Sequence, residues 1–168
     1  MISTLLAENP TLVRILFVVA VAMSTVIGWV LHRSRRFRAL MVLAAISLVG
    51  TLALTLSPSS GFATAFCTVQ FSVPFQGIDT LANVAMMLPL TLFAALRLGR
   101  PLPVFAAVSC LSALIELLQA LVPTLGRACD TDDWFMNTIG AAFGAVLAVV
   151  ITSVVEAHRP ERLHRTPQ

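Results

Sequence analysis

Five long apolar stretches, separated by short polar segments, make up most of this chain. They cover approximately residues 12–31, 39–56, 79–96, 102–122 and 134–155. A stretch of about 20 apolar residues is long enough to cross the hydrocarbon core of a bilayer as an α-helix. The pattern therefore predicts an all-α integral membrane protein, in which residues 1–168 form a single bundle of five transmembrane helices.

The composition agrees with a protein that lies almost entirely in a membrane. The chain is 58% hydrophobic and 11% charged, whereas soluble domains are about 45–50% apolar and about 25% charged. Every basic residue is an arginine in or beside a short connecting segment or a terminus, and tyrosine is absent. The net charge of +3 is thus no sign of nucleic-acid binding, and membrane lipids are the expected partners. Because basic residues follow the first stretch, we expect a retained span there, not a cleaved signal peptide.

Arginine placement predicts the orientation of the bundle. Four arginines lie between His32 and Arg38, two lie at positions 97 and 100, and three lie in the tail, residues 157–168. In an alternating five-span arrangement these three segments fall on the same side. The positive-inside rule therefore predicts an outer N-terminus and a frayed cytoplasmic tail, in a multi-pass protein of the bacterial plasma membrane.

Polar side chains inside the spans converge near the opposite, outer surface. Asp79 and Asn83 share a helix face because they are four residues apart, and Asp133 and Asn137 repeat that spacing. At 1.5 Å per residue, Glu116 lies roughly 9 Å below the outer end of its span. Polar residues in spans are costly and mark functional sites by default. The candidate binding residues are Asp79, Asn83, Glu116, Gln119, Arg127, Asp130, Asp133 and Asn137.

Structural roles compete with this interpretation. Asp79, and either Asp132 or Asp133, are suitable N-caps for the third and fifth spans. Asn83 and Asn137 can also act as hydrogen-bonding contacts between helices.

Other residues invite a structural interpretation from the start. Glu116 and Arg127 could form a purely structural ion pair. Gly140 and Gly144 form a small-xxx-small face that favours close helix packing. Pro89 is expected to kink the third span.

Two cysteines fall in the predicted outer loops, where disulfides persist. Cys67 lies in the segment before the third span, and Cys129 lies in the segment before the fifth span. We therefore predict a Cys67–Cys129 disulfide that ties these two loops together.

The order and spacing of these residues resemble the VanZ-like family of small bacterial membrane proteins. The resemblance implies a link to glycopeptide resistance, chiefly to teicoplanin, at the cell envelope. It provides no catalytic residues to assign. Its pattern comprises Pro74-Phe75, Asp79, Asn83, Pro89, Glu116-x-x-Gln119, Arg127-x-x-Asp130-x-x-Asp133, Asn137, Gly140 and Gly144.

Three functions fit these observations. The first is a site at the outer leaflet that binds a lipid-linked cell-wall intermediate or a glycopeptide, with Arg127 meeting a phosphate or carboxylate. The second is an acid/base or metal-assisted enzyme acting on a lipid headgroup, with Glu116 as a proton donor. Asp130, Asp132 and Asp133 could hold a hard divalent cation for such an enzyme, but they do not form a complete ion-binding loop. We therefore predict no metal site, and we also predict no cofactor. The third is an envelope scaffold without a ligand.

Overall fold

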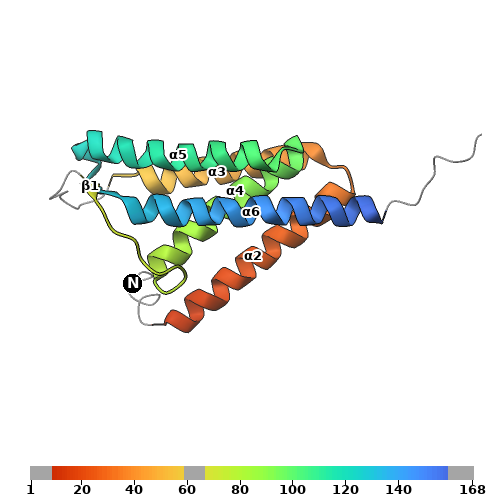
Figure 1. Cartoon of the computed structure of the whole chain (residues 1–168), viewed down its shortest axis with the longest axis horizontal. Coiled ribbons are helices and arrows are strands. Elements are labelled where there is room, and N and C mark those ends of the chain that lie inside the picture. The colour runs from red at the N-terminus through yellow and green to blue at the C-terminus, as the bar shows by residue number, and fades with distance from the viewer. Residues whose placement is uncertain (1–8, 59–66, 159–168) are drawn as a thin grey trace, which may run out of the picture.

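The computed structural model describes residues 9–58 and 67–158, and five long helices dominate it (Figure 1). The five helices are long and apolar enough to cross a membrane, which confirms the predicted fold class. Each predicted span agrees with its helix to within three residues at both ends. The helices are α2 (Pro10–Arg33), α3 (Phe37–Leu56), α4 (Ile78–Leu98), α5 (Pro101–Leu121) and α6 (Thr131–Ala157).

Proline and glycine explain several of these helix boundaries. Pro10 and Pro101 occupy the start of α2 and α5, where the missing N–H group costs nothing. Gly99 ends α4 with a φ of 66°, the left-handed conformation that glycine adopts most easily. Pro89 lies within α4, which continues as one helix past it, and the kink expected there stays a prediction.

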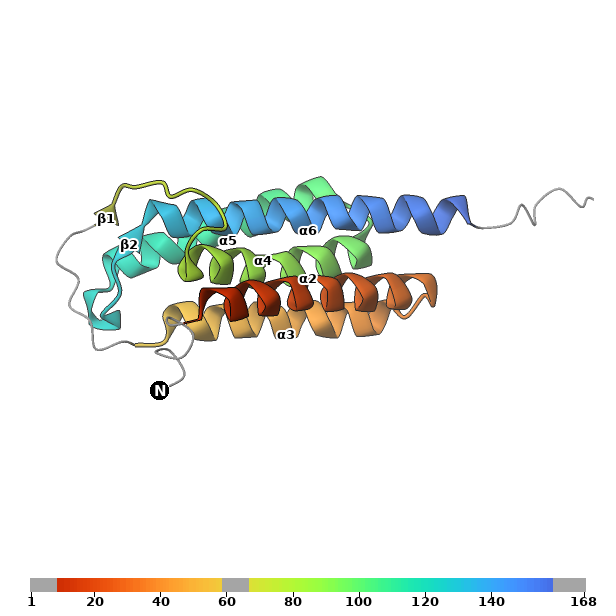
Figure 2. The ribbon, with the colours of Figure 1, turned by 90° about the horizontal axis from the view of Figure 1, so that it is seen from below.

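Helix α4 is the centre of the bundle. It contacts all four other helices, most extensively α6, and Figure 2 shows it between α2 and α3 on one side and α5 and α6 on the other. In the most apolar 18-residue stretch of α4, 56% of the residues are buried, against 6% in the corresponding stretch of α2. More than half of this part of α4 is therefore shielded from lipid, whereas the corresponding part of α2 is mostly exposed or half-buried.

Gly140 and Gly144 give α6 a surface that lies directly against α4. A Cβ atom on Gly140 would lie 2.4 Å from the carbonyl oxygen of Val84, and one on Gly144 would lie 2.5 Å from that of Leu88. Any larger residue would push the two backbones apart. The small-xxx-small face thus has the packing role that its sequence favoured.

A short parallel pairing of β1 (Cys67–Thr68) with β2 (Cys129–Asp130) closes one end of the bundle. The predicted disulfide between Cys67 and Cys129 is present there. The two-residue strands were not predicted, because so short a pairing has no detectable period in the sequence. They attach the segment before α4 to the start of α6.

The two ends of the bundle differ in chemistry. The α2–α3 and α4–α5 connections and the C-terminal end of α6 gather at the end away from β1 and β2 (Figures 1 and 2). Arginines occupy both connections. This is the arrangement that the alternating model requires, while the side of the membrane each end faces stays a prediction. Residues 1–8, 59–66 and 159–168, which include most of the predicted frayed tail, lie outside the described residues.

Candidate functional site

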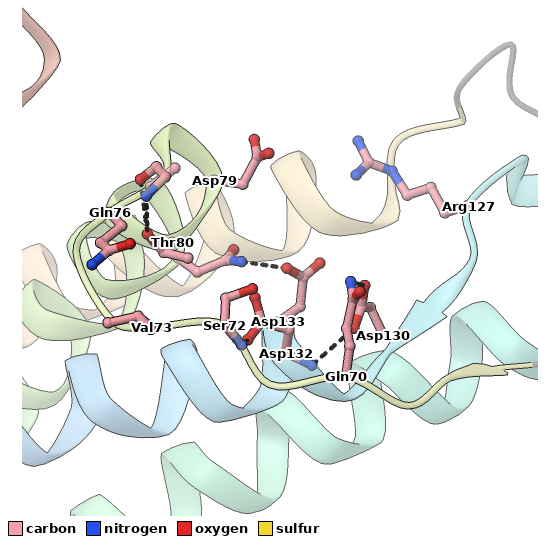
Figure 3. Close-up of a pocket in the computed structure, with 13 residues that line it drawn as sticks. Gln70, Ser72, Val73, Gln76, Asp79, Thr80, Arg127, Asp130, Asp132 and Asp133 are labelled. Carbon is pink, nitrogen blue, oxygen red and sulfur yellow. Dashed lines mark hydrogen bonds between the residues drawn. The ribbon is translucent and has the colours of Figure 1, made fainter. Parts of the chain in front are cut away.

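A polar cavity of about 740 Å³ lies at the β1–β2 end of the bundle, where the first turns of α4 and α6 meet the segment before α4 (Figure 3). Five of the eight predicted binding residues line it: Asp79, Asn83, Arg127, Asp130 and Asp133. Its lining also includes residues that were not predicted as binding residues, among them Gln70, Ser72, Gln76, Thr80 and Asp132.

Asp130 fixes the α6 side of the cavity. It is the N-cap of α6, and its carboxylate accepts a hydrogen bond from the backbone N–H of Asp132 at 2.9 Å. Its second oxygen accepts one from the side-chain amide of Gln70 at 2.6 Å. The prediction that Asp132 or Asp133 caps this helix is therefore wrong, because α6 begins at Thr131 and both residues lie in its first turn. Acidic residues there still interact favourably with the helix dipole.

The segment between β1 and α4 forms one wall of the cavity and is bonded along its length to α6. The backbone N–H of Gln70 donates to the Thr131 hydroxyl at 3.0 Å, and that of Ser72 donates to the Asp132 carboxylate at 2.7 Å. Phe71 packs edge-on against Phe135, with 5.5 Å between ring centroids. Together with the disulfide, these contacts hold an irregular segment at a defined position.

Helix α4 contributes Asp79 and Asn83. Its N-cap is Gly77, whose N–H donates to the Thr80 hydroxyl at 3.1 Å, so the expected capping role of Asp79 is wrong. The side-chain amide of Asn83 donates to Asp133 at 2.5 Å and joins α4 to α6. This bond is both the interhelical contact that was considered for Asn83 and a part of the cavity wall.

Three cavity residues keep polar atoms that no described residue engages. Asp79 is exposed, and its carboxylate has no partner among the described residues. Asp133 has one oxygen bonded to Asn83 and a second that makes no hydrogen bond to a described residue. Arg127 donates through Nε to the carbonyl of Ser57 at 3.1 Å, and its terminal nitrogens make no hydrogen bond to a residue that the structure describes. Figure 3 shows the three side chains pointing toward a shared space.

Glu116 does not line the cavity. It is 6% exposed, and its carboxylate accepts a hydrogen bond from the backbone N–H of Asp130 at 2.8 Å. Among the described residues it forms no ion pair with Arg127, so the structural pair considered from the sequence is absent. Glu116 instead accepts a hydrogen bond from the backbone of β2, and this contact helps to hold Asp130 in position.

Gln119 and Asn137 also lie apart from the cavity and join helices. Gln119 donates to the carbonyl of Thr55 at 3.0 Å, one of the carbonyls that the end of α3 leaves without an intrahelical partner. Asn137 donates to the Ser112 hydroxyl on α5 at 2.9 Å and is 2% exposed. The predicted polar layer is therefore two structures, a cavity between α4 and α6 and a set of hydrogen bonds around α5.

The unpredicted cavity residues had a partial signal in the sequence. Gln70, Ser72 and Gln76 are polar residues in an otherwise apolar, proline-containing segment. Nothing in that spacing indicates which helix the segment contacts. Within residues 9–58 and 67–158, no three side chains of His, Cys, Asp or Glu are grouped so as to hold a metal ion.

The chain matches a family model described as VanZ/LLP1 over residues 11–152. The match takes in most of the chain and every residue that lines the cavity. No curated protein matches the chain, and no solved structure does.

Proposed function

The chain belongs to the VanZ/LLP1 family of membrane proteins, and from that premise we propose that its cavity binds the polar headgroup of a lipid-linked cell-envelope component. The observation that carries the proposal is a set of polar atoms on Asp79, Asp133 and Arg127 that make no hydrogen bond within residues 9–58 and 67–158 and that face one cavity of about 740 Å³.

The chemistry of these atoms defines the headgroup. Carboxylate oxygens accept hydrogen bonds, so Asp79 and Asp133 select hydroxyl, amide or ammonium donors. A guanidinium pairs with a phosphate or carboxylate, which gives Arg127 the acidic part of the ligand. A sugar or amino sugar joined to a phosphate presents both kinds of group. A simple anion does not fit, since four carboxylates line the cavity beside one guanidinium.

Two features support placement of this cavity at the outer leaflet. The disulfide beside it joins Cys67 and Cys129, and disulfides persist in oxidising compartments. The arginine-rich connections lie at the other end of the bundle, which the positive-inside rule assigns to the cytoplasm. A headgroup on the outer surface of the plasma membrane would thus meet the cavity at the level of the helix ends.

The proposal is tested by direct binding to the full-length chain in detergent. The probe is a short-chain polyprenyl diphosphate that carries an amino sugar, and the comparison lipid is phosphatidylcholine. We expect saturable binding of the probe alone. Asp79→Asn and Arg127→Gln should each weaken it by about tenfold to a hundredfold, because a hydrogen bond to a charged group contributes about 1.5–3 kcal/mol.

The matched control is Glu156→Gln, which removes a carboxylate at the far end of α6 and should leave probe binding unchanged. Equal binding of the probe by all three variants would refute the site. Binding of teicoplanin in place of the probe would assign the cavity to the glycopeptide. Conversion of the probe during incubation would show a headgroup enzyme.

A further inference from the structure

The turn between α2 and α3 lies at the end of the bundle away from β1 and β2 (Figure 1). A basic hollow lies at this turn. Its volume is about 550 Å³, and its lining consists of Arg35, Arg36, Phe37, Arg38 and Ala39. Three of these five lining residues are arginines, and guanidinium groups are suited to an anion with several oxygen atoms.

The described part of the chain supplies no anion for these arginines. Residues 9–78 contain no aspartate or glutamate, and the first turn of α3 has no acidic residue. The guanidinium groups of Arg35, Arg36 and Arg38 make no ion pair or hydrogen bond with a described residue, including Glu156 near the end of α6. Three positive charges are thus concentrated without a compensating carboxylate among the described residues.

Two neighbouring arginines differ from these three, because each of them contacts an aromatic ring. The guanidinium of Arg33 lies over Trp29 at 5.5 Å, and that of Arg97 lies over Phe37 at 6.0 Å. Phe37 also meets His32 edge-on, with 6.0 Å between ring centroids. Phe37 is therefore held by packing, while the three lining arginines have no partner in the described part of the chain.

We propose that this hollow binds the phosphate of an anionic phospholipid in the leaflet at this end of the bundle. The hollow lies where two membrane-spanning helices end, which is the depth of lipid headgroups. Its arginines match the oxygen atoms of a phosphate, and the apolar lining residues Phe37 and Ala39 suit the glycerol and the first acyl carbons. This site is separate from the cavity, and its test does not depend on the function proposed there.

The test titrates the full-length chain in detergent with dioctanoyl phosphatidylglycerol and, separately, dioctanoyl phosphatidylcholine. Trp29 contacts Arg33 beside the hollow, and the chain has only two tryptophans. A Trp134→Phe background therefore makes Trp29 fluorescence a local reporter. We expect a saturable response to phosphatidylglycerol and none to phosphatidylcholine at the same concentrations.

Combined Arg35→Gln, Arg36→Gln and Arg38→Gln should weaken phosphatidylglycerol binding roughly a hundredfold, and each single change about fivefold. The three corresponding lysine changes keep the charge and should retain binding to within about tenfold. Arg14→Gln, near the start of α2, is the control and should have no effect. Equal responses to the two lipids, or unchanged binding in the combined glutamine variant, would overturn the proposal. Displacement of the lipid by an equal concentration of inorganic phosphate would assign the hollow to free phosphate and not to a lipid.

Discussion

Gly140→Ala is the sharpest structural perturbation that the bundle offers. The new Cβ atom would lie 2.4 Å from the carbonyl oxygen of Val84 and 2.9 Å from its Cα atom. These are backbone atoms of α4, so a change of rotamer cannot relieve the contact. The helices must separate at this level.

The size of the separation follows from ordinary contact distances. Normal van der Waals contact begins at 3.4 Å, against 2.4 Å here, so α4 and α6 must open by about 1 Å. Asn83 immediately precedes Val84 and donates to Asp133 at 2.5 Å. The same displacement stretches that bond to about 3.5 Å, beyond the normal limit. Overpacking of this kind lowers the free energy of unfolding by about 1–3 kcal/mol.

Unfolding in increasing concentrations of SDS measures this loss, and Gly50→Ala is the matched control. Gly50 lies within α3, and a Cβ atom there would meet nothing within 4 Å. The control should be neutral or stabilised by up to about 1 kcal/mol, because alanine favours a helix more than glycine does. If Gly140→Ala unfolds at the same SDS concentration as Gly50→Ala, the α4–α6 contact is wrong.

Three further predictions test the surroundings of the cavity. Glu116→Gln should unfold like the wild type because its side-chain carbonyl still accepts the backbone hydrogen bond. Glu116→Leu should lower the free energy of unfolding by about 1–3 kcal/mol in the same SDS assay. Equal stability of the two variants would contradict the role of Glu116 as the acceptor for the N–H of Asp130. Cys67→Ser should lower the free energy of unfolding by up to about 4 kcal/mol, because the disulfide no longer constrains the loop. Reduction should slow the migration of the wild type on a denaturing gel but not that of this variant. Identical migration of the wild type before and after reduction would exclude the bond to Cys129. In a cysteine-free background, Gln76→Cys should react with an impermeant maleimide in intact cells, and Ser34→Cys only after permeabilisation; the reverse result would invert the orientation.

Sequence patterns predicted the helices well because a lipid environment excludes most other backbone conformations. A backbone in hydrocarbon must satisfy its own hydrogen bonds, so a long apolar stretch has little choice but to be a helix. The disulfide was predictable for a related reason, since alternating spans place Cys67 and Cys129 on the same side. Each of these inferences depends on topology alone and needs no knowledge of how the helices are rotated.

The site was predicted less completely because rotation and local geometry decide it. The depth of Glu116 could be counted in residues, yet depth does not tell which neighbour an α5 side chain faces. The run from Asp130 to Asp133 contains four residues able to cap a helix, and only the backbone angles at Asp130 select it. The wall formed by Gln70 and Ser72 has no helical or strand period, so its contact with α6 left no trace in the pattern.

The elements that form the walls of the cavity are hydrogen-bonded to the first turn of α6 or to the residue before it. The segment before α4 reaches it through the bond from Ser72 to Asp132, and α4 reaches it through the bond from Asn83 to Asp133. Glu116 of α5 accepts a hydrogen bond from the backbone N–H of Asp130, the residue just before this turn. A variant that removes any of these hydrogen bonds therefore changes the shape of the cavity. Asp79 and Arg127 make no hydrogen bond to α6 among the described residues, so they can be altered without releasing a wall from it. This division is why binding is best tested at those two positions and cavity shape at the other contacts.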